Sequence, residues 1–550
     1  ARRNFDTISM TDSVRIIGDK IALVGFDDIS PVPSEEFKST ANRTDANVAF
    51  SLSEESFALA PLQHIDSLPK DTLSSTDQGN SLKQGIRGDS YQGALSALPE
   101  CYPICVGNKR AAPSSQMLVA AARNYPPPPH KYGPIVLVTS YTKFSDLAHG
   151  PRGREASRAM RSFRLNICDG TLTLLSVVPE KMMHNPAFCR RHPTLNVVYA
   201  CTESVKKEGE IVTLALDGRT GALREHCPAV GAGGTSTCYM TISNSGRRML
   251  LVNYWDSTIC CFELLGDGKM GRLLSSYDPK EGKPMKASSD SHVNHSRNDD
   301  AAQAERQGDP HSHAIVLEPT QGQIAYVPDL GMDVIRQLHF DEETGVVTPC
   351  GEITSGVKAN QRGLGPRYLH FAKDLHACYV VNELASQVAV FEYHPDVATS
   401  IAKAYKNAAS RTEKEQVIFQ CEATLTLVQT VSTIPEAFPV EMNTCGRVTI
   451  HPSGDFVVTS NRGHDSVAVH RVHKDSKPPG MLTLAGIFHT RGETPRHFQF
   501  DKSGQWLLVA NQDSNTTAVF QFNCSTGAVS YSGNTYACES PNFVCVWDGA

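Results

Sequence analysis

The stretch HACYVVNELASQVAVFEYHP, residues 376–395, contains the pattern that decides the fold. An apolar run is followed by a short polar segment, and after a tight turn a second run begins in which apolar and polar residues alternate. Two β-rich runs joined in this way are typical of a β-hairpin. The same arrangement returns along the chain, which indicates a repeat.

Six further copies of the apolar run with its polar segment occur before and after this stretch in the sequence. They read PIVLVTSYTKF (134–144), NVVYACTES (196–204), RRMLLVNYWDS (247–257), QIAYVPDLGMD (323–333), DFVVTSNRGHDS (455–466) and QWLLVANQDSN (505–515). We call the residue after each apolar run the anchor. The anchors are Ser140, Thr202, Asn253, Asp329, Asn382, Asn461 and Asn511, at intervals of 62, 51, 76, 53, 79 and 50 residues. A period near fifty, with two long intervals, predicts a repeat architecture.

Each unit also contains further alternating runs and Gly-containing turns. DGRTG (217–221), DEETG (341–345) and NCSTG (523–527) occupy the same place in three units. Four short strands per unit, repeated seven times, predict an all-β fold, a seven-bladed β-propeller. We expect CESPNFVCVW (538–547) to form the strand that completes the blade begun at 134–141, because an unclosed ring would expose strand edges.

Residues 1–130 differ in composition from the propeller, which is predicted over 131–550. They are rich in polar residues and end in a Pro-rich linker, which predicts a mostly disordered extension. One possible strand pair in it is VRIIGDKIALVGF (14–26), and CYPIC (101–105) is predicted to be flexible. Insertions at 275–308 and 396–418 explain the two long intervals, the second as a surface helix capped by Asp396. Both insertions are interpreted as decoration.

Composition limits the functions that the chain can have. The net charge is −6 and no long basic run occurs, which argues against nucleic-acid binding. The sequence has no run of eighteen or more apolar residues, so no membrane-spanning helix is predicted. The 16 cysteines form no disulfide framework and fit a reducing compartment. A cytoplasmic location is expected, with organellar import left open, and the N-terminal extension is the segment expected to meet any protein partner.

Several motifs in order resemble the seven-bladed β-propeller lactonase family, which includes propeller-type 6-phosphogluconolactonases and carboxymuconate-lactonizing enzymes. The resemblance rests on PHSHAIVLEPTQGQIAYVPDLGMDVI, GPRYLHFAKDLHACYVVNELASQVAVFEY, IHPSGDFVVTSNRGHDSVAV and PRHFQFDKSGQWLLVANQDSNTTAVF, and it covers about residues 133–547. The chain departs from the family pattern in its 34-residue polar insertion before PHSH and in Tyr368 where His often follows the Arg.

The resemblance implies hydrolysis of 6-phosphoglucono-1,5-lactone to 6-phosphogluconate, with a small anionic sugar lactone as substrate and no cofactor. Lactonization of a carboxymuconate-like diacid is an alternative. A non-catalytic propeller that serves as a binding or assembly scaffold is another. Opening a lactone requires an activated water, a stabilised oxyanion and a group that holds the anionic substrate.

The candidate site residues lie at equivalent turns of different blades, which a repeat places around one axis. By resemblance, His313, Arg367 and Glu383 match the catalytic positions, and His311 is the other histidine of PHSH. Glu383 or His313 is expected to activate water or transfer a proton. The expected substrate-binding residues are His311, Arg462, Arg496, Asn253 and Asn511, and Arg367 is expected to bind the anion with Arg462 and Arg496.

Structural roles remain open for the same residues. The asparagines recur at one repeat position, so turn formation explains them as well as substrate contact does. Glu383 and the arginines also fit a salt-bridge lattice. Asp329 and Asp333 are expected to bond neighbouring backbone N–H groups. His292 and His295 with the PHSH histidines give only a weak metal pattern, and no metal site is predicted.

Overall fold

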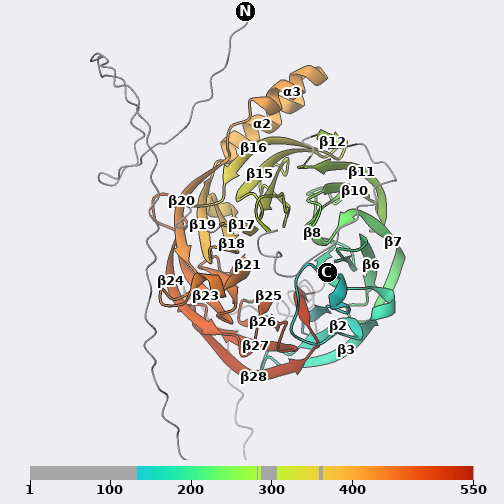
Figure 1. Cartoon of the computed structure of the whole chain (residues 1–550), viewed down its shortest axis with the longest axis vertical. Helices are drawn as coiled ribbons and strands as arrows, with labels where there is room; N and C mark the ends of the chain where they lie inside the picture. Colours follow the sequence, from blue (N-terminus) through green and yellow to red (C-terminus); the bar gives the residue numbers. More distant parts are fainter. Residues whose placement is uncertain (1–132, 281–282, 286–305, 358–362, 549–550) are drawn as a thin grey trace, which may run out of the picture. The chain divides into compact units, whose positions relative to one another are not determined.

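Seven antiparallel sheets around one axis contain the strands of the described chain (Figure 1). The computed structural model describes residues 133–280, 283–285 as backbone, 306–357 and 363–548. The predicted seven-bladed β-propeller is therefore confirmed. The predicted extension at 1–130, with its strand pair at 14–26 and the CYPIC sequence, lies outside the described residues.

Each blade is a sheet whose strands follow one another from the innermost strand to the outer edge. Blade 1 is β29 (Pro541–Trp547), β1 (Ile135–Ser140), β2 (Arg158–Leu165) and β3 (Leu172–Pro179). Blade 2 is β4 (Pro186–Arg191), β5 (Val197–Thr202), β6 (Glu208–Leu216) and β7 (Leu223–Thr235). Blade 3 is β8 (Thr237–Ile242), β9 (Arg248–Asn253), β10 (Ile259–Leu264), β11 (Met270–Asp278) and β12 (Lys283–Met285).

The remaining blades follow in chain order. Blade 4 is β13 (Val316–Leu317), β14 (Ile324–Asp329), β15 (Val334–Asp341) and β16 (Val346–Thr354). Blade 5 is β17 (Pro366–Ala372), β18 (Ala377–Asn382), β19 (Gln387–Tyr393) and β20 (Leu425–Ser432). Blade 6 is β21 (Thr444–Ile450), β22 (Phe456–Arg462), β23 (Ser466–His473) and β24 (Met481–His489). Blade 7 is β25 (Pro495–Phe500), β26 (Trp506–Asn511), β27 (Thr516–Phe522) and β28 (Val529–Ala537).

The second strand of a blade is the apolar run of the repeat. β1, β5, β14, β18 and β26 are buried along their whole length. Such a strand has a neighbouring blade against each face, so apolar side chains are needed on both. The apolar run is therefore continuous rather than alternating, and its anchor lies where the strand ends.

The C-terminal segment closes the ring. β29 pairs antiparallel with β1, from Ile135 opposite Trp547 to Ser140 opposite Pro541. The predicted closing strand is confirmed. β29, which comes from the C-terminal segment, is the innermost strand of blade 1. This closure joins strands about 400 residues apart in sequence, so β1 is not left as the unpaired inner edge of blade 1.

The two predicted insertions differ from expectation in detail. Residues 275–278 belong to β11, and β12 adds a fifth strand to blade 3, so the first insertion begins later than predicted. The second contains two helices, α2 (Pro395–Asn407) and α3 (Arg411–Phe419). Asp396 is not the N-cap of α2, because Pro395 already starts the helix and His394 precedes it. Ser410, whose side chain accepts a hydrogen bond from the Glu413 N–H, caps α3 and separates it from α2.

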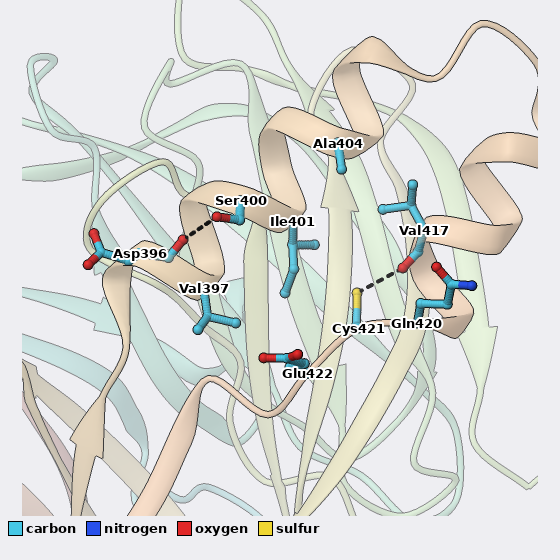
Figure 2. A pocket seen from close by; sticks show the side chains of 9 residues that line it. All are labelled: Asp396, Val397, Ser400, Ile401, Ala404, Val417, Gln420, Cys421 and Glu422. Atoms are coloured by element: carbon cyan, nitrogen blue, oxygen red, sulfur yellow. Dashed lines mark hydrogen bonds between the residues drawn. The ribbon is translucent and has the colours of Figure 1, made fainter.

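The two helices lie beside the outer strands of blades 4 and 5 (Figure 1). An open pocket between α2, α3 and the segment that follows them is lined by Asp396, Val397, Ser400, Ile401, Ala404, Val417, Gln420, Cys421 and Glu422 (Figure 2). Neither helix, nor any other in the described residues, is long and apolar enough to cross a membrane.

Candidate active site

At the anchor end of the propeller axis, which we call the mouth, many of the polar groups come from two residue positions of the repeat. The first position directly follows the anchor. It is occupied by Tyr141, Glu203, Tyr254, Leu330, Glu383, Arg462 and Gln512. The second is an extra residue in an innermost strand: the pairing register shifts between Pro366 and Tyr368, and likewise between Pro495 and His497. A β-bulge re-aims the side chain that it displaces, and in these two strands the displaced side chains are Arg367 and Arg496.

Glu383 is the centre of the first charged group. Its carboxylate is buried and its Oε2 lies 2.8 Å from both Arg367 Nε and Arg462 Nη2. Arg306 pairs with the other oxygen, Oε1. Burial raises the pKa of this carboxyl, but the charges of Arg306, Arg462 and Arg367 outweigh burial and hold the pKa well below its usual value. Glu383 is therefore a permanent carboxylate that holds three guanidinium groups together.

Arg306 comes from the end of the insertion at 275–308. Besides Glu383, its guanidinium contacts the Tyr254 hydroxyl, with Nε 3.4 Å from the oxygen. Burial lowers the pKa of Arg306, but Glu383 raises it more, so the group stays protonated. The last residues of this insertion thus contribute a charge to the mouth, and the interpretation of the whole segment as decoration is wrong for Arg306.

Glu203 is the centre of a second group and occupies the same repeat position as Glu383. The Tyr141 hydroxyl donates a 2.7 Å hydrogen bond to its Oε2, and Arg496 Nη2 lies 4.0 Å from the same oxygen. His149 Nδ1 lies 3.8 Å from Oε1. The Arg496 guanidinium also covers the Tyr141 ring, 5.3 Å from its centroid. Glu203 therefore has a phenol, an imidazole and one distant arginine where Glu383 has three arginines.

The two groups form one electrostatic unit. Burial, followed by the charges of Arg496, Arg462 and Arg306, lowers the pKa of His149 well below its usual value. Burial lowers the pKa of Arg496, but Tyr141, Glu203 and Glu383 raise it above the ordinary arginine value. The unit has two carboxylates and four guanidinium groups, so positive charge is in excess. Such a surface attracts and holds small anions.

The PHSH histidines lie beside the Glu383 group. The His311 ring stacks on Tyr254 with centroids 4.9 Å apart, and His313 meets the same ring edge-on at 5.1 Å. His313 is also edge-on to Tyr368, 5.5 Å away. Burial and the nearby Arg367 lower the pKa of His313 well below its usual value. His313 is therefore a neutral imidazole at neutral pH, with a nitrogen lone pair for accepting a proton.

The anchor asparagines serve the same structural purpose in four blades. The side-chain amides of Asn253, Asn382, Asn461 and Asn511 each donate to a backbone carbonyl 21 to 28 residues earlier, at Ala232, Ser355, Thr433 and Thr490 respectively. All four are fully buried. The structure thus places Asn253 and Asn511 inside their blades, whereas it brings together Arg367, Glu383, Arg462, Arg496 and both PHSH histidines.

The anchor Asp329 and the loop residue Asp333 organise the backbone near PHSH. Asp329 Oδ1 accepts from the N–H groups of His311 and Gly331 at 2.8 and 3.1 Å, which confirms its predicted role. Asp333 Oδ1 accepts from the N–H groups of Leu364 and Gly365, both at 2.9 Å. These two donors lie more than thirty residues away, so Asp333 joins blade 4 to the start of blade 5 rather than closing a local turn.

Glu203, Tyr141, His149 and Arg306 are mouth residues that the sequence interpretation did not name. A signal existed for Glu203 and Tyr141, since both directly follow an anchor as Glu383 does. No repeat position marks His149, which lies in the connection between β1 and β2, or Arg306, which lies at the end of an insertion. Those two residues are found only once the chain is folded.

Comparison with known proteins identifies the family. The sequence profile of the family described as Lactonase, 7-bladed beta-propeller matches residues 135–416 and 415–546. The chain therefore belongs to this family of propeller lactonases, hydrolases that act on lactones.

Individual relatives are distant but cover most of the propeller. The 6-phosphogluconolactonase of Bacillus subtilis (strain 168) is 25% identical over 362 residues, which is 66% of this chain and 86% of the relative. A 6-phosphogluconolactonase of Formosa agariphila is 26% identical over 373 residues, 66% of this chain and 88% of the relative. The structure of a periplasmic gluconolactonase of Pseudomonas aeruginosa shares the fold, with a TM-score of 0.55 and 21% identity over 75% of this chain and 99% of that one.

Proposed function

We propose that the chain hydrolyses 6-phosphoglucono-1,5-lactone to 6-phosphogluconate, a reaction of the pentose phosphate route. The observation that carries this proposal is the excess of arginine over carboxylate at the mouth, where Arg306, Arg367, Arg462 and Arg496 surround two buried glutamates. A phosphorylated sugar lactone supplies the complementary negative charge. Membership of the lactonase family and the names of the relatives from Bacillus subtilis and Formosa agariphila support the same substrate class.

In this proposal Glu383 is a positioning residue rather than the base. Arginines engage both of its oxygens, Arg306 at Oε1 and Arg367 and Arg462 at Oε2, so the carboxylate is occupied by these contacts. Its role is to hold Arg367 and Arg462 where they bind the substrate phosphate and the oxygen that becomes negative during the reaction. Arg496, held less closely by Glu203, binds a further oxygen of the substrate.

His313 is the proposed general base. Water attacks the lactone carbonyl carbon while the neutral His313 ring accepts its proton. The ester C–O bond of the ring then breaks, and the ring oxygen takes up the proton from the imidazolium as it becomes the free hydroxyl of 6-phosphogluconate. The imidazole ends neutral, and the new carboxyl group loses its proton to solvent. His311, stacked on Tyr254, supports the position of the base from the adjacent side of the ring.

The deciding experiment measures lactone opening with two substrates. Turnover of 6-phosphogluconolactone, corrected for spontaneous hydrolysis, is compared with turnover of a carboxymuconate-type lactone. The proposal expects the phosphorylated substrate to be preferred and Arg367→Ala to reduce its kcat/KM by about 100-fold. Arg411→Ala is the control, because Arg411 is 92% exposed on α3.

Three results would count against the proposal. Preference for the dicarboxylate would favour the lactonizing alternative, and no activity with either lactone would favour a binding scaffold. Equal turnover by wild type and Arg367→Ala would show that the mouth is not the site of lactone hydrolysis.

A further inference from the structure

A second basic group lies along the innermost strands, within a layer of rings and two residues beyond it, further from the anchors than Arg367 and Arg496. The layer is made by residues of several blades: Phe543 and Tyr239 flank Phe188 with centroids 4.5 Å from it, and Tyr239 meets Tyr368 at 5.4 Å. His497 stacks on Phe543 at 3.7 Å. In blade 6 the corresponding residue, two positions after Cys445 in β21, is Arg447.

Arg190 of β4 approaches this layer from two positions further along its strand. Its guanidinium carbon lies 5.0 Å from the Phe188 ring centroid and 5.3 Å from that of Tyr239. Its Nε donates to the Met240 carbonyl at 2.9 Å. Burial lowers the pKa of Arg447, and the charge of Arg190 lowers it further, which places the two guanidinium groups within electrostatic reach of each other.

Neither arginine has an acidic partner in the part of the chain that the structure describes. Among the described residues no carboxylate forms an ion pair with Arg190 or Arg447, in contrast to every arginine of the mouth. Arg447 Nε is buried without a hydrogen-bond partner there. Two guanidinium groups near each other and away from carboxylates repel one another, and burial increases that cost. A bound anion would remove it.

Two histidines add hydrogen-bond donors to the same place. His497 Nδ1 accepts from the Val544 N–H, and His370 Nδ1 accepts from the Ile450 N–H, both at 3.1 Å. Burial, together with Arg447 and Arg190, lowers the pKa of His370 to about 4. Burial, followed by the charges of Arg447, Arg367 and Arg190, lowers the pKa of His497 well below its usual value. Each ring is therefore neutral and carries its proton on Nε2. The Nε2 of His497 contacts Arg447 itself, so two donors face each other there.

We propose that Arg190, Arg447, His370 and His497 bind a small inorganic oxyanion of the phosphate class, at a site separate from the mouth. The four side chains present only N–H donors toward one another, and the arginines offer the planar forks that match a tetrahedral oxyanion. Arg190, Arg447 and His370 are each partly exposed, so solvent reaches the group. The site does not depend on the reaction proposed for the mouth.

The test uses the full chain and two probes. In crystals soaked with selenate, a tetrahedral dianion, anomalous scattering is expected between the guanidinium groups of Arg190 and Arg447. In calorimetric titrations with inorganic phosphate, Arg447→Gln and Arg190→Gln are each expected to weaken one binding event by about 10-fold or more. Arg411→Gln is the matched control, and lactone turnover by both variants is expected to stay within about 2-fold of wild type, since neither residue belongs to the mouth.

Several outcomes would overturn the proposal. Selenate found only at the mouth would do so, and this measurement needs no variant to fold. Identical phosphate titrations for wild type and both variants would do the same. A site that binds chloride but neither selenate nor phosphate would contradict the oxyanion class, and phosphate displaced by a lactone substrate analogue would contradict its separation from the mouth.

Discussion

Blades 2 and 5 place a glutamate at the same repeat position, yet the two carboxylates have different surroundings. Glu383 lies among three arginines, two of them at 2.8 Å. Glu203 receives a hydrogen bond from Tyr141 and has its one arginine, Arg496, at 4.0 Å. The repeat therefore sets where a side chain is presented, while residues specific to each neighbouring blade set its charge and its partners.

The largest expected effect is the difference in kcat/KM between variants of the two histidines beside these groups. His313→Gln removes the proposed base next to the Glu383 group and should lower kcat/KM by about 1000-fold. His149→Gln changes the imidazole beside Glu203 and should lower it by less than about 5-fold, because orientation of Glu203 is also supplied by Tyr141. Both rings are buried and neutral, and the charge of Arg496 acts on both, so each variant is the control for the other. A larger loss of kcat/KM in His149→Gln than in His313→Gln would indicate that the general base lies beside Glu203.

Replacing the glutamates themselves tests whether their surroundings matter. Glu383→Gln leaves the buried Arg367 and the partly exposed Arg306 and Arg462 without their shared counter-charge, and about 3 kcal/mol of stability and about 100-fold in kcat/KM should be lost. Glu203→Gln retains an acceptor for the Tyr141 hydroxyl and should lower kcat/KM by about 10-fold.

Denaturant unfolding and steady-state kinetics measure both glutamate effects. Glu343→Gln, at a side chain 77% exposed on a hairpin turn, is the neutral control. Equal losses in Glu383→Gln and Glu203→Gln would show that the repeat position alone determines function.

As the pH falls, the free energy of unfolding should decline at a higher pH than the one at which the Glu383 carboxylate becomes protonated. The folded-state pKa values of His313 and His149 lie well below their ordinary value of about 6.5, so the unfolded chain binds more protons as the pH falls through that value. The free energy of unfolding should therefore decline below about pH 6.5, and the contribution of Glu383 should be lost only below about pH 4.3, its unfolded value.

The acid limb of kcat/KM should likewise lie below pH 6.5, because His313 remains a neutral base there. Urea titrations and pH–rate profiles between pH 5 and 8 measure the two effects. An acid limb centred at pH 6.5 or higher would contradict the proposed environment of the base.

The sequence predicts the ring well because each blade repeats the same local pattern. It also predicts that Arg367, Glu383 and Arg462 converge, and the structure confirms that they do. Their surroundings are not predictable in the same way. Arg306 lies at the end of a long polar insertion and His149 lies in a connection without repeat counterparts, so only tertiary contacts bring them to the mouth. The number of charges around a glutamate, and hence its pKa, depends on such contacts.

The smallest expected effects concern the anchors, where blades resemble one another. Asn253→Ala removes an amide that donates to the Ala232 carbonyl and an oxygen that accepts from Thr237, and it should cost about 2 kcal/mol of stability. Asn511→Ala removes one donated hydrogen bond, to Thr490, and an oxygen that has no partner among the described residues, so it should cost about 1 kcal/mol. Denaturant unfolding measures both costs, and KM for the lactone should not change. A raised KM in either variant would return these asparagines to the substrate-binding role predicted from sequence, and would mean that the anchor position, too, differs in function from blade to blade.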